Sequence, residues 1–278
     1  MGLSSFAKIN LSLKVNSKTN KGLHEIQSYF CLINLADKIV INKIGENKDK
    51  IHFKGPFAKL VRKRNNSVIE LLKTLRKLEI ITDYYSINVT KNIPVFAGLG
   101  GGTSNAASVL KFLLKKKINK RLLNILEKKI GSDLRLFFHK QGFLKNLSSI
   151  TNLPNKTKLY FVLIQPKVKC STKEIYSKIK KYNKKEIFNK QKINSKKKYI
   201  NHLSKSNNDL QSIVENKYPH IKKLLLDIID EKGCYFSRMT GSGSVCYGLF
   251  KDEIIAKKAL NKIKNKYPNF WVSFAKTV

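Results

Sequence analysis

A run of glycines interrupts the chain in the segment PVFAGLGGGTSNAA, residues 94–107. Four of the five residues from Gly98 to Gly102 are glycine, in a sequence with only 14 glycines among 278 residues. The segment before the run, YYSINVT, has the composition of a strand, and apolar residues at helical spacing follow from about Ser104. A strand, a glycine-rich turn and a helix in this order predict a fold in which the N-terminus of a helix is accessible, because the glycines of the preceding loop have no side chains to cover it.

Such a turn is suited to binding a phosphate group. The first N–H groups of a helix have no partner within it, and the helix dipole adds positive potential there. Glycines let the backbone approach a phosphate without a Cβ in the way. Thr103 or Ser104 can cap the helix and offer a hydroxyl to a phosphate or to Mg²⁺. A tight turn before an ordinary capped helix is the alternative.

Two common phosphate motifs are excluded by the same residues. A P-loop ends in Gly-Lys-Ser/Thr, whereas Gly102 is followed by Thr103 without a lysine. The dinucleotide fingerprint G-x-G-x-x-G requires a glycine three residues after Gly100, and that position is Thr103.

The other patterns predict an α+β fold. Alternating residues predict a β-meander in the first fifty residues, beginning with a strand at 7–15. Helices are predicted at 66–78, with Ser67 and Glu70 as a capping box, and at 120–131. The lysine- and asparagine-rich residues 177–208 predict a solvated helix or loop, and CYFSRMTGSGSVCYGLF predicts two strands joined by a glycine turn.

The net charge of +38 comes from 56 Lys and Arg against 18 Asp and Glu. Such a charge attracts polyanions, so weak and salt-sensitive binding of nucleic acid is expected. Lysine, asparagine and isoleucine are abundant throughout, however, which also suits a coding sequence rich in A and T. A dedicated reader of nucleic acid would more often show arginine clusters with interleaved aromatics. Nucleic acid is therefore expected only as a non-specific partner.

The cysteines and the apolar runs bear on location. The four cysteines lie far apart, without a C-x-x-C pair, so neither a metal site nor a disulfide framework is expected. The start of the chain lacks the pattern of a signal peptide, and no apolar run is long enough to span a membrane. We predict a cytoplasmic protein with reduced thiols.

The glycine segment resembles the ATP-binding loop of the GHMP kinases, small-molecule kinases named for galactose, homoserine, mevalonate and phosphomevalonate. Five further segments resemble the family in the same order along the chain: AKINLSLKV, KGLHEIQSYFCLINLADKI, GSDLRLFF, NDLQSIVENKYPHI and RMTGSGSVCYGLF. Because these segments extend to about residue 250, the chain is identified as a member of the family.

The resemblance implies two α+β domains: residues 1–150 as an ATP-binding, ribosomal-protein-S5-like domain and residues 151–278 as a ferredoxin-like domain. It implies that ATP, with Mg²⁺, phosphorylates the 2-hydroxyl of a CDP-linked methylerythritol (CDP-methylerythritol). A homoserine or mevalonate substrate is one alternative. A homologue that binds nucleotide or nucleic acid without turnover is another. The protein is expected to be a monomer or a homodimer.

The resemblance also assigns roles to residues. Asp133 is assigned as the proton acceptor and Lys8 as its partner, which favours the ionised carboxylate and stabilises developing charge. Asn10 projects from the same face of its strand as Lys8 and is assigned to substrate hydroxyls. His24 is assigned to a hydrogen bond with cytosine, and Tyr176 to stacking on that base.

Two glycine-containing motifs complete the implied site. ATP binding is assigned to Pro94, Gly98, Leu99, Gly100, Gly101, Gly102, Thr103 and Ser104. The third motif of the family is assigned to the side of the substrate, where it braces the phosphate loop: Gly241, Ser242 and Gly243.

Each assignment has an ordinary alternative, and two residues depart from the family pattern. Asp133 could cap a helix, Lys8 could be a solvated strand residue, and the third motif could be only a hairpin turn. Leu23 replaces a tyrosine that stacks on cytosine in the family, so base affinity is expected to be weaker. Arg135 replaces a proline near Asp133, and either points to solvent or adds charge beside the phosphates.

Overall fold

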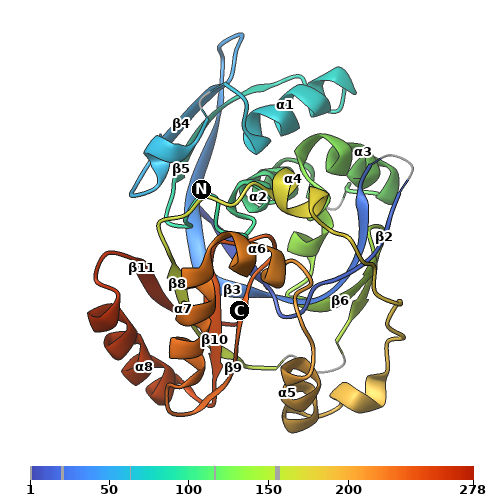
Figure 1. The fold of residues 1–278 in the computed structure, drawn as a ribbon. Helices are drawn as coiled ribbons and strands as arrows, with labels where there is room; N and C mark the ends of the chain where they lie inside the picture. The colour runs from blue at the N-terminus through green and yellow to red at the C-terminus, as the bar shows by residue number, and fades with distance from the viewer. Residues whose placement is uncertain (1, 20–21, 63, 116, 154–156) are drawn as a thin grey trace. The chain divides into compact units, whose positions relative to one another are not determined.

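A computed structural model describes residues 2–19, 22–62, 64–115, 117–153 and 157–278. Helices and strands are mixed along this part of the chain, in runs of several strands or several helices (Figure 1), which confirms the α+β class. The chain divides into two compact units, each made of several segments. The first unit comprises residues 1–8, 35–95 and 100–139, and the second comprises residues 9–34, 96–99 and 140–278. The predicted domain boundary at residue 150 stays a prediction.

The strands are β1 (Gly2–Asn10), β2 (Lys14–Lys18), β3 (His24–Ile44), β4 (Lys50–Lys54), β5 (Tyr84–Thr90), β6 (Gln141–Asn146), β7 (Ser149–Asn152), β8 (Tyr160–Gln165), β9 (Cys234–Met239), β10 (Cys246–Phe250) and β11 (Trp271–Lys276). The α-helices are α1 (Ser67–Lys77), α2 (Gly101–Leu114), α3 (Lys120–Ile130), α4 (Thr172–Ser177), α5 (Lys196–Ser204), α6 (Gln211–Lys217), α7 (Pro219–Ile229) and α8 (Glu253–Lys266). Three short 3₁₀ turns are η1 (Ala58–Leu60), η2 (Leu134–Phe138) and η3 (Lys190–Ile193).

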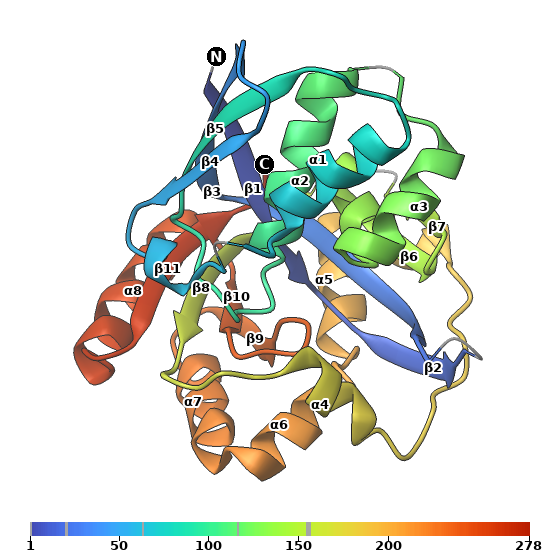
Figure 2. The ribbon, with the colours of Figure 1, turned by 90° about the horizontal axis from the view of Figure 1, so that it is seen from above.

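The first unit combines strands with three helices that lie side by side (Figure 2). β4 pairs with β5 in parallel, and β5 pairs antiparallel with residues 38–44 of β3. The helix at α1 was predicted correctly, but its cap is Asn66 and not Ser67. The Oδ1 atom of Asn66 accepts hydrogen bonds of 3.1 Å from the amides of Val68 and Ile69, because Asn66 is the last residue with an extended backbone.

The second unit contains a four-stranded antiparallel sheet in the order β11-β8-β10-β9. Helices α7 and α8 pack against this sheet (Figure 1). The apolar residues of β8 and α7, among them Val162, Ile164, Leu224 and Ile228, form part of one buried cluster. In the same unit, β6 pairs with the beginning of β3.

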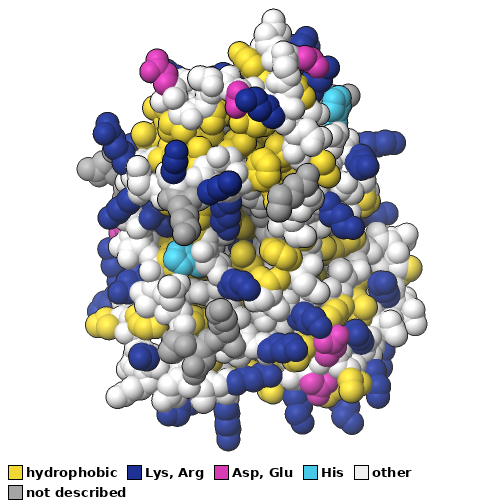
Figure 3. All heavy atoms as spheres, turned by 180° about the vertical axis from the view of Figure 1, so that it is seen from behind, with side chains coloured by type: hydrophobic (Ala, Val, Ile, Leu, Met, Phe, Trp, Pro, Cys, Tyr) yellow, Lys and Arg dark blue, Asp and Glu magenta, His cyan; other side chains and the backbone are white. Residues whose placement is uncertain are grey.

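Basic side chains are spread over the face shown in Figure 3, with apolar and neutral side chains between them. The basic side chains on this face are dispersed, as the lysines are along the sequence, and do not gather in a single basic patch. None of the helices in the described part of the chain has both the length and the hydropathy that a membrane span requires.

Candidate functional site

The glycine run forms the first turn of α2 in the first unit. The helix begins at Gly101, three residues before the predicted start, because Gly100 has a φ of 68° and serves as the N-cap. The first hydrogen bond of the helix joins the Ser104 amide to the Gly100 carbonyl at 2.8 Å. Three amides precede it, those of residues 101–103, and the positive end of the helix dipole lies with them. This turn can therefore hold an anion.

No side chain caps this helix, so the expected capping by Thr103 or Ser104 is wrong. Ser104 is buried, and its hydroxyl donates to the Phe6 carbonyl at 2.6 Å and lies 2.7 Å from the Ser5 hydroxyl. The side chain thus fastens α2 to β1. Its assignment to ATP stays a prediction.

Gly100 brings the two predicted catalytic residues together. A Cβ at Gly100 would lie 2.7 Å from Cζ of Phe137, 3.1 Å from Oδ2 of Asp133 and 3.3 Å from Cε of Lys8. The positive φ and the lack of space both require glycine here. It follows that the carboxylate of Asp133 and the side chain of Lys8 flank the N-terminus of α2.

Lys8 is only 5% exposed, so it is not a solvated strand residue. Burial lowers the pKa of its ammonium group, and the attraction of the Asp133 carboxylate opposes that effect. Asp133 precedes η2, but its side chain makes no capping hydrogen bond. The space beside Gly131 is bounded by Oδ1 of Asp133 and Oγ1 of Thr103, which lie 3.2 and 3.3 Å from an added Cβ. A carboxylate, a hydroxyl, an amine and free amides are thus concentrated at one place.

Arg135 does not point to solvent. Its side chain is 8% exposed, and its Nε and Nη2 atoms donate to the two carboxylate oxygens of Glu127 at 2.6 Å each. Nη2 also donates to Asn124 at 3.0 Å. The charge of Arg135 is therefore paired with α3, two residues after Asp133.

A buried charged network behind the glycine turn was missed by the sequence analysis. Lys91 forms an ion pair with Asp37, and both side chains are less than 5% exposed. Asn105 of α2 donates to Asp37 at 3.0 Å, and Lys91 donates to Asn105 at 3.2 Å. Burial lowers the pKa of Lys91 and the carboxylate of Asp37 opposes this effect. Because Nζ of Lys91 lies 3.3 Å from an added Cβ at Gly101, the network supports the anion-binding turn from beneath.

In the second unit, the third motif braces the beginning of the glycine segment. A Cβ at Gly98 would lie 2.2 Å from the Thr240 carbonyl oxygen and 3.2 Å from the Gly243 nitrogen. The amide of Ser244 donates to the Phe96 carbonyl at 3.2 Å. β9 and β10 pair on either side of this motif, so the predicted hairpin is confirmed. Ser242 lies within hydrogen-bond distance of Thr172, at 2.9 Å.

The predicted substrate residues are also in the second unit. Asn10 is buried and its side-chain amide donates to Ser28 at 2.8 Å. The ring centroids of His24 and Tyr176 lie 5.0 Å apart. Burial, and then the charge of Lys18, lower the pKa of His24. Tyr182 lies 6.3 Å from His24, measured between ring centroids, and was not predicted, since it belongs to the lysine-rich segment.

Two residues that were predicted to belong to the ATP loop have buried side chains, as residues that support the loop structurally would have: Pro94 and Leu99.

Comparison with known proteins gives matches in both halves of the chain. The profile described as "GHMP kinases N terminal domain" matches residues 66–136, and the one described as "GHMP kinases C terminal" matches residues 188–269. The chain is 37% identical to the 4-diphosphocytidyl-2-C-methyl-D-erythritol kinase of Pelagibacter ubique (strain HTCC1062), over 99% of this chain and 98% of that protein. It is 32% identical to the kinase of the same name from Wolbachia sp. subsp. Brugia malayi (strain TRS), over 98% and 96%.

Solved structures agree on the fold. A 4-(cytidine 5'-diphospho)-2C-methyl-D-erythritol kinase matches with a TM-score of 0.75 and 22% identity, over 100% of both chains. A homoserine kinase from Cytophaga hutchinsonii matches with a TM-score of 0.68 and 18% identity, over 100% of this chain and 94% of the other. At these identities the likeness concerns the fold alone, which is the fold expected from the sequence.

Proposed function

The chain belongs to the GHMP kinase family, and we propose that it transfers the γ-phosphoryl group of ATP to the 2-hydroxyl of 4-diphosphocytidyl-2-C-methyl-D-erythritol. One observation supports the reaction type most directly. The free amides of α2, the Asp133 carboxylate and the Lys8 side chain meet around Gly100. The substrate is taken from the name that the full-length relatives share.

Phosphoryl transfer depends mainly on positioning and on stabilising negative charge. In the proposed mechanism the amides of residues 101–103 hold ATP phosphate oxygens. Asp133 accepts the proton of the attacking hydroxyl. The ammonium of Lys8 stabilises the charge that develops; burial lowers the pKa of Lys8, and the attraction of the neighbouring Asp133 carboxylate offsets part of that effect.

Mg²⁺ would be bound with ATP, where it neutralises charge on the phosphates. Oxygen ligands suit this ion, and the residues beside the turn that offer them are Asp133 and Thr103. The hydroxyl of Ser104, which the sequence analysis considered, is already hydrogen-bonded to the Phe6 carbonyl.

The second unit supplies the proposed recognition of the substrate. We assign Asn10 to the substrate hydroxyls, His24 to the cytosine edge and Tyr176 to its face. The lowered pKa of His24 keeps the imidazole neutral at pH 7, so that one ring nitrogen donates and the other accepts. The third motif is assigned to the substrate side through residues 241–243.

The test is ATP consumption by the purified protein with and without the CDP-linked substrate, for the wild type and for Asp133→Asn. We expect substrate-dependent turnover that Asp133→Asn lowers by about 10³-fold, in the range of general base catalysis. Asp230→Asn, at an exposed site, is the matched control and should retain full activity. Turnover unaffected by Asp133→Asn would keep the kinase and discard this base. Turnover only with homoserine or mevalonate would replace the substrate.

Location and assembly remain predictions of the sequence. We expect a cytoplasmic monomer or homodimer, and light scattering after gel filtration distinguishes the two states. Co-purifying RNA that is released by salt would agree with non-specific binding. RNA retained at high salt in a protein that consumes no ATP would favour a binding protein without turnover.

A further inference from the structure

The lysine-rich segment is fastened to the second unit immediately after Tyr182. The Asn183 amide donates to the Val15 carbonyl at 2.8 Å, and the Asn183 carbonyl accepts from Asn16 at 3.0 Å. The side chain of Asn183 also donates to Asp209 at 2.7 Å. Residue 183 is therefore held on both sides by β2 and by the chain before α6.

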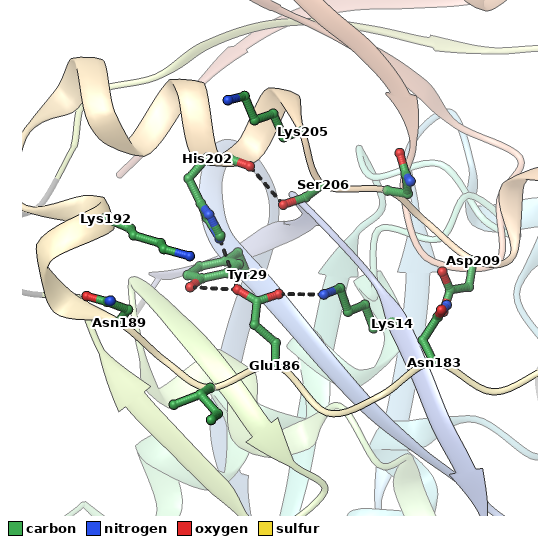
Figure 4. Close-up of a pocket in the computed structure, with 12 residues that line it drawn as sticks. Lys14, Tyr29, Asn183, Glu186, Asn189, Lys192, His202, Lys205, Ser206 and Asp209 are labelled. Carbon is green, nitrogen blue, oxygen red and sulfur yellow. Dashed lines mark hydrogen bonds and ion pairs between the residues drawn. The ribbon is translucent and has the colours of Figure 1, made fainter.

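Glu186 provides a second anchor three residues later. Its amide donates to Gln27 Oε1 at 2.6 Å, and its carbonyl accepts from Gln27 Nε2 at 3.0 Å. Figure 4 shows its carboxylate between Lys14, Tyr29 and His202, at the wall of a pocket of about 370 Å³. Lys14 Nζ lies 2.9 Å from Oε2, and His202 Nε2 lies 3.0 Å from Oε1.

These anchors place Tyr182 beside the end of β3 that carries His24. The ring centroids of Tyr182 and His24 are 6.3 Å apart, and those of Tyr176 and His24 are 5.0 Å apart. An ion pair of 2.9 Å between Lys185 and Glu25 fixes the same alignment. Two tyrosines six residues apart in the sequence therefore lie near one histidine.

The exposure of these side chains indicates a ligand surface. Tyr182 is 45% exposed although its neighbours in the chain are anchored, so its ring is presented to solvent from a fixed position. Leu23, next to His24, is 49% exposed and has no aromatic face. An exposed aromatic ring beside a neutral hydrogen-bonding group has the chemistry that recognises a nucleobase.

We propose that Tyr182 supplies the aromatic face for the cytosine ring that Leu23 cannot supply, next to Tyr176. This inference rests on the proposed function, which makes the ligand a cytidine nucleotide. Tyr182 thereby becomes a specificity residue, and the segment that holds it becomes part of the substrate site.

The test compares Tyr182→Leu and Tyr182→Phe with Tyr235→Leu, which removes a tyrosine of similar exposure (41%) on β9. Binding of CDP is measured by calorimetry, and kcat and KM are measured for both substrates. We expect Tyr182→Leu to weaken CDP binding and raise the KM for the CDP-linked substrate about tenfold, within the range of base stacking. The KM for ATP and kcat should be unchanged. Tyr182→Phe keeps the ring and should bind as the wild type does, as should Tyr235→Leu.

A compensating change makes the test independent of any defect in Tyr182→Leu. Leu23→Tyr should tighten CDP binding, and Tyr182→Leu should cost less affinity in that background. Unchanged CDP binding by Tyr182→Leu in an active kinase would overturn this inference alone. A wild type without turnover, whose CDP binding still depends on Tyr182, would overturn the proposed reaction and keep the base site.

Discussion

Arg135 donates two hydrogen bonds of 2.6 Å to the carboxylate of Glu127, and thereby joins η2 to α3. Because Asp133 stands at the start of η2, this pair fixes the backbone that presents the proposed base. Two parallel hydrogen bonds from a planar guanidinium define an orientation that a lysine at this position could not.

We expect Arg135→Met to lower the free energy of unfolding by about 3 kcal/mol, because it leaves the Glu127 carboxylate, whose side chain is only 12% exposed, without its partner. Removing both charges, as in Arg135→Met with Glu127→Met, should restore part of this loss. Urea unfolding measures the change, and the exposed Arg121→Met on α3 is the control. A loss in the double variant that equals the sum of the losses in the two single variants would show that the pair is not coupled.

A second prediction concerns the tightest point of the anion-binding turn. Gly100→Ala forces a side chain into a left-handed backbone and to within 2.7 Å of Phe137. We expect activity to fall at least about 100-fold and stability to fall by about 1–3 kcal/mol. Gly45→Ala is the control, since an added Cβ there meets nothing within 4 Å. Normal ATP binding by Gly100→Ala would contradict the role given to this turn.

The Lys91–Asp37 pair should be essential for folding of the first unit. Lys91→Met leaves the Asp37 carboxylate buried without its cation, so a loss of about 3–5 kcal/mol is expected. The exposed pair of Lys43 and Asp83 gives the contrast, because Asp83→Asn should change stability by less than about 1 kcal/mol. Thermal and urea unfolding measure both. Equal effects at the two pairs would mean that burial does not decide their strength.

Local patterns predicted several elements well, although the predicted strand at 7–15 is divided between β1, which ends at Asn10, and β2, which begins at Lys14. The strand β5, the helix α3 with Gly131 after it, and the β9–β10 hairpin lie where the sequence placed them. The start of α2 was predicted too late, because glycines have low helix propensity and yet occupy its first turn. Tertiary contacts around the loop override that propensity.

From the sequence, only those residues of the candidate site that lie in a recognisable motif could be predicted. Lys8, Asp133 and the glycine turn belong to recognisable segments, and they do come together. Lys91 and Asp37 belong to no such segment. Asp37 lies within β3 and Lys91 directly follows β5, and only the tertiary fold buries the two against each other. Tyr182 was hidden for a similar reason, because its neighbours are mostly lysine and asparagine and its position depends on distant hydrogen bonds.

The last prediction concerns acid and the segment that holds Tyr182. Burial raises the pKa of Glu186, but hydrogen bonds from His202 and Lys14 outweigh that effect and lower it to about 2. A depressed carboxylate pKa contributes stability that is complete above the unfolded value of about 4.3 and is lost as the pH falls toward the folded value. The segment should therefore loosen between about pH 4.3 and about pH 2.

Hydrogen exchange of residues 183–206 measures this loosening. Glu186→Gln should raise exchange at neutral pH by about tenfold, because it removes one charged hydrogen-bonding partner of about 1.4 kcal/mol or more. The difference between wild type and Glu186→Gln should shrink as the pH falls toward about 2, since the protonated carboxyl then resembles the amide. Glu79→Gln, at an exposed site, should leave exchange unchanged at every pH. A difference that is constant with pH would show that the ionised carboxylate does not hold this segment.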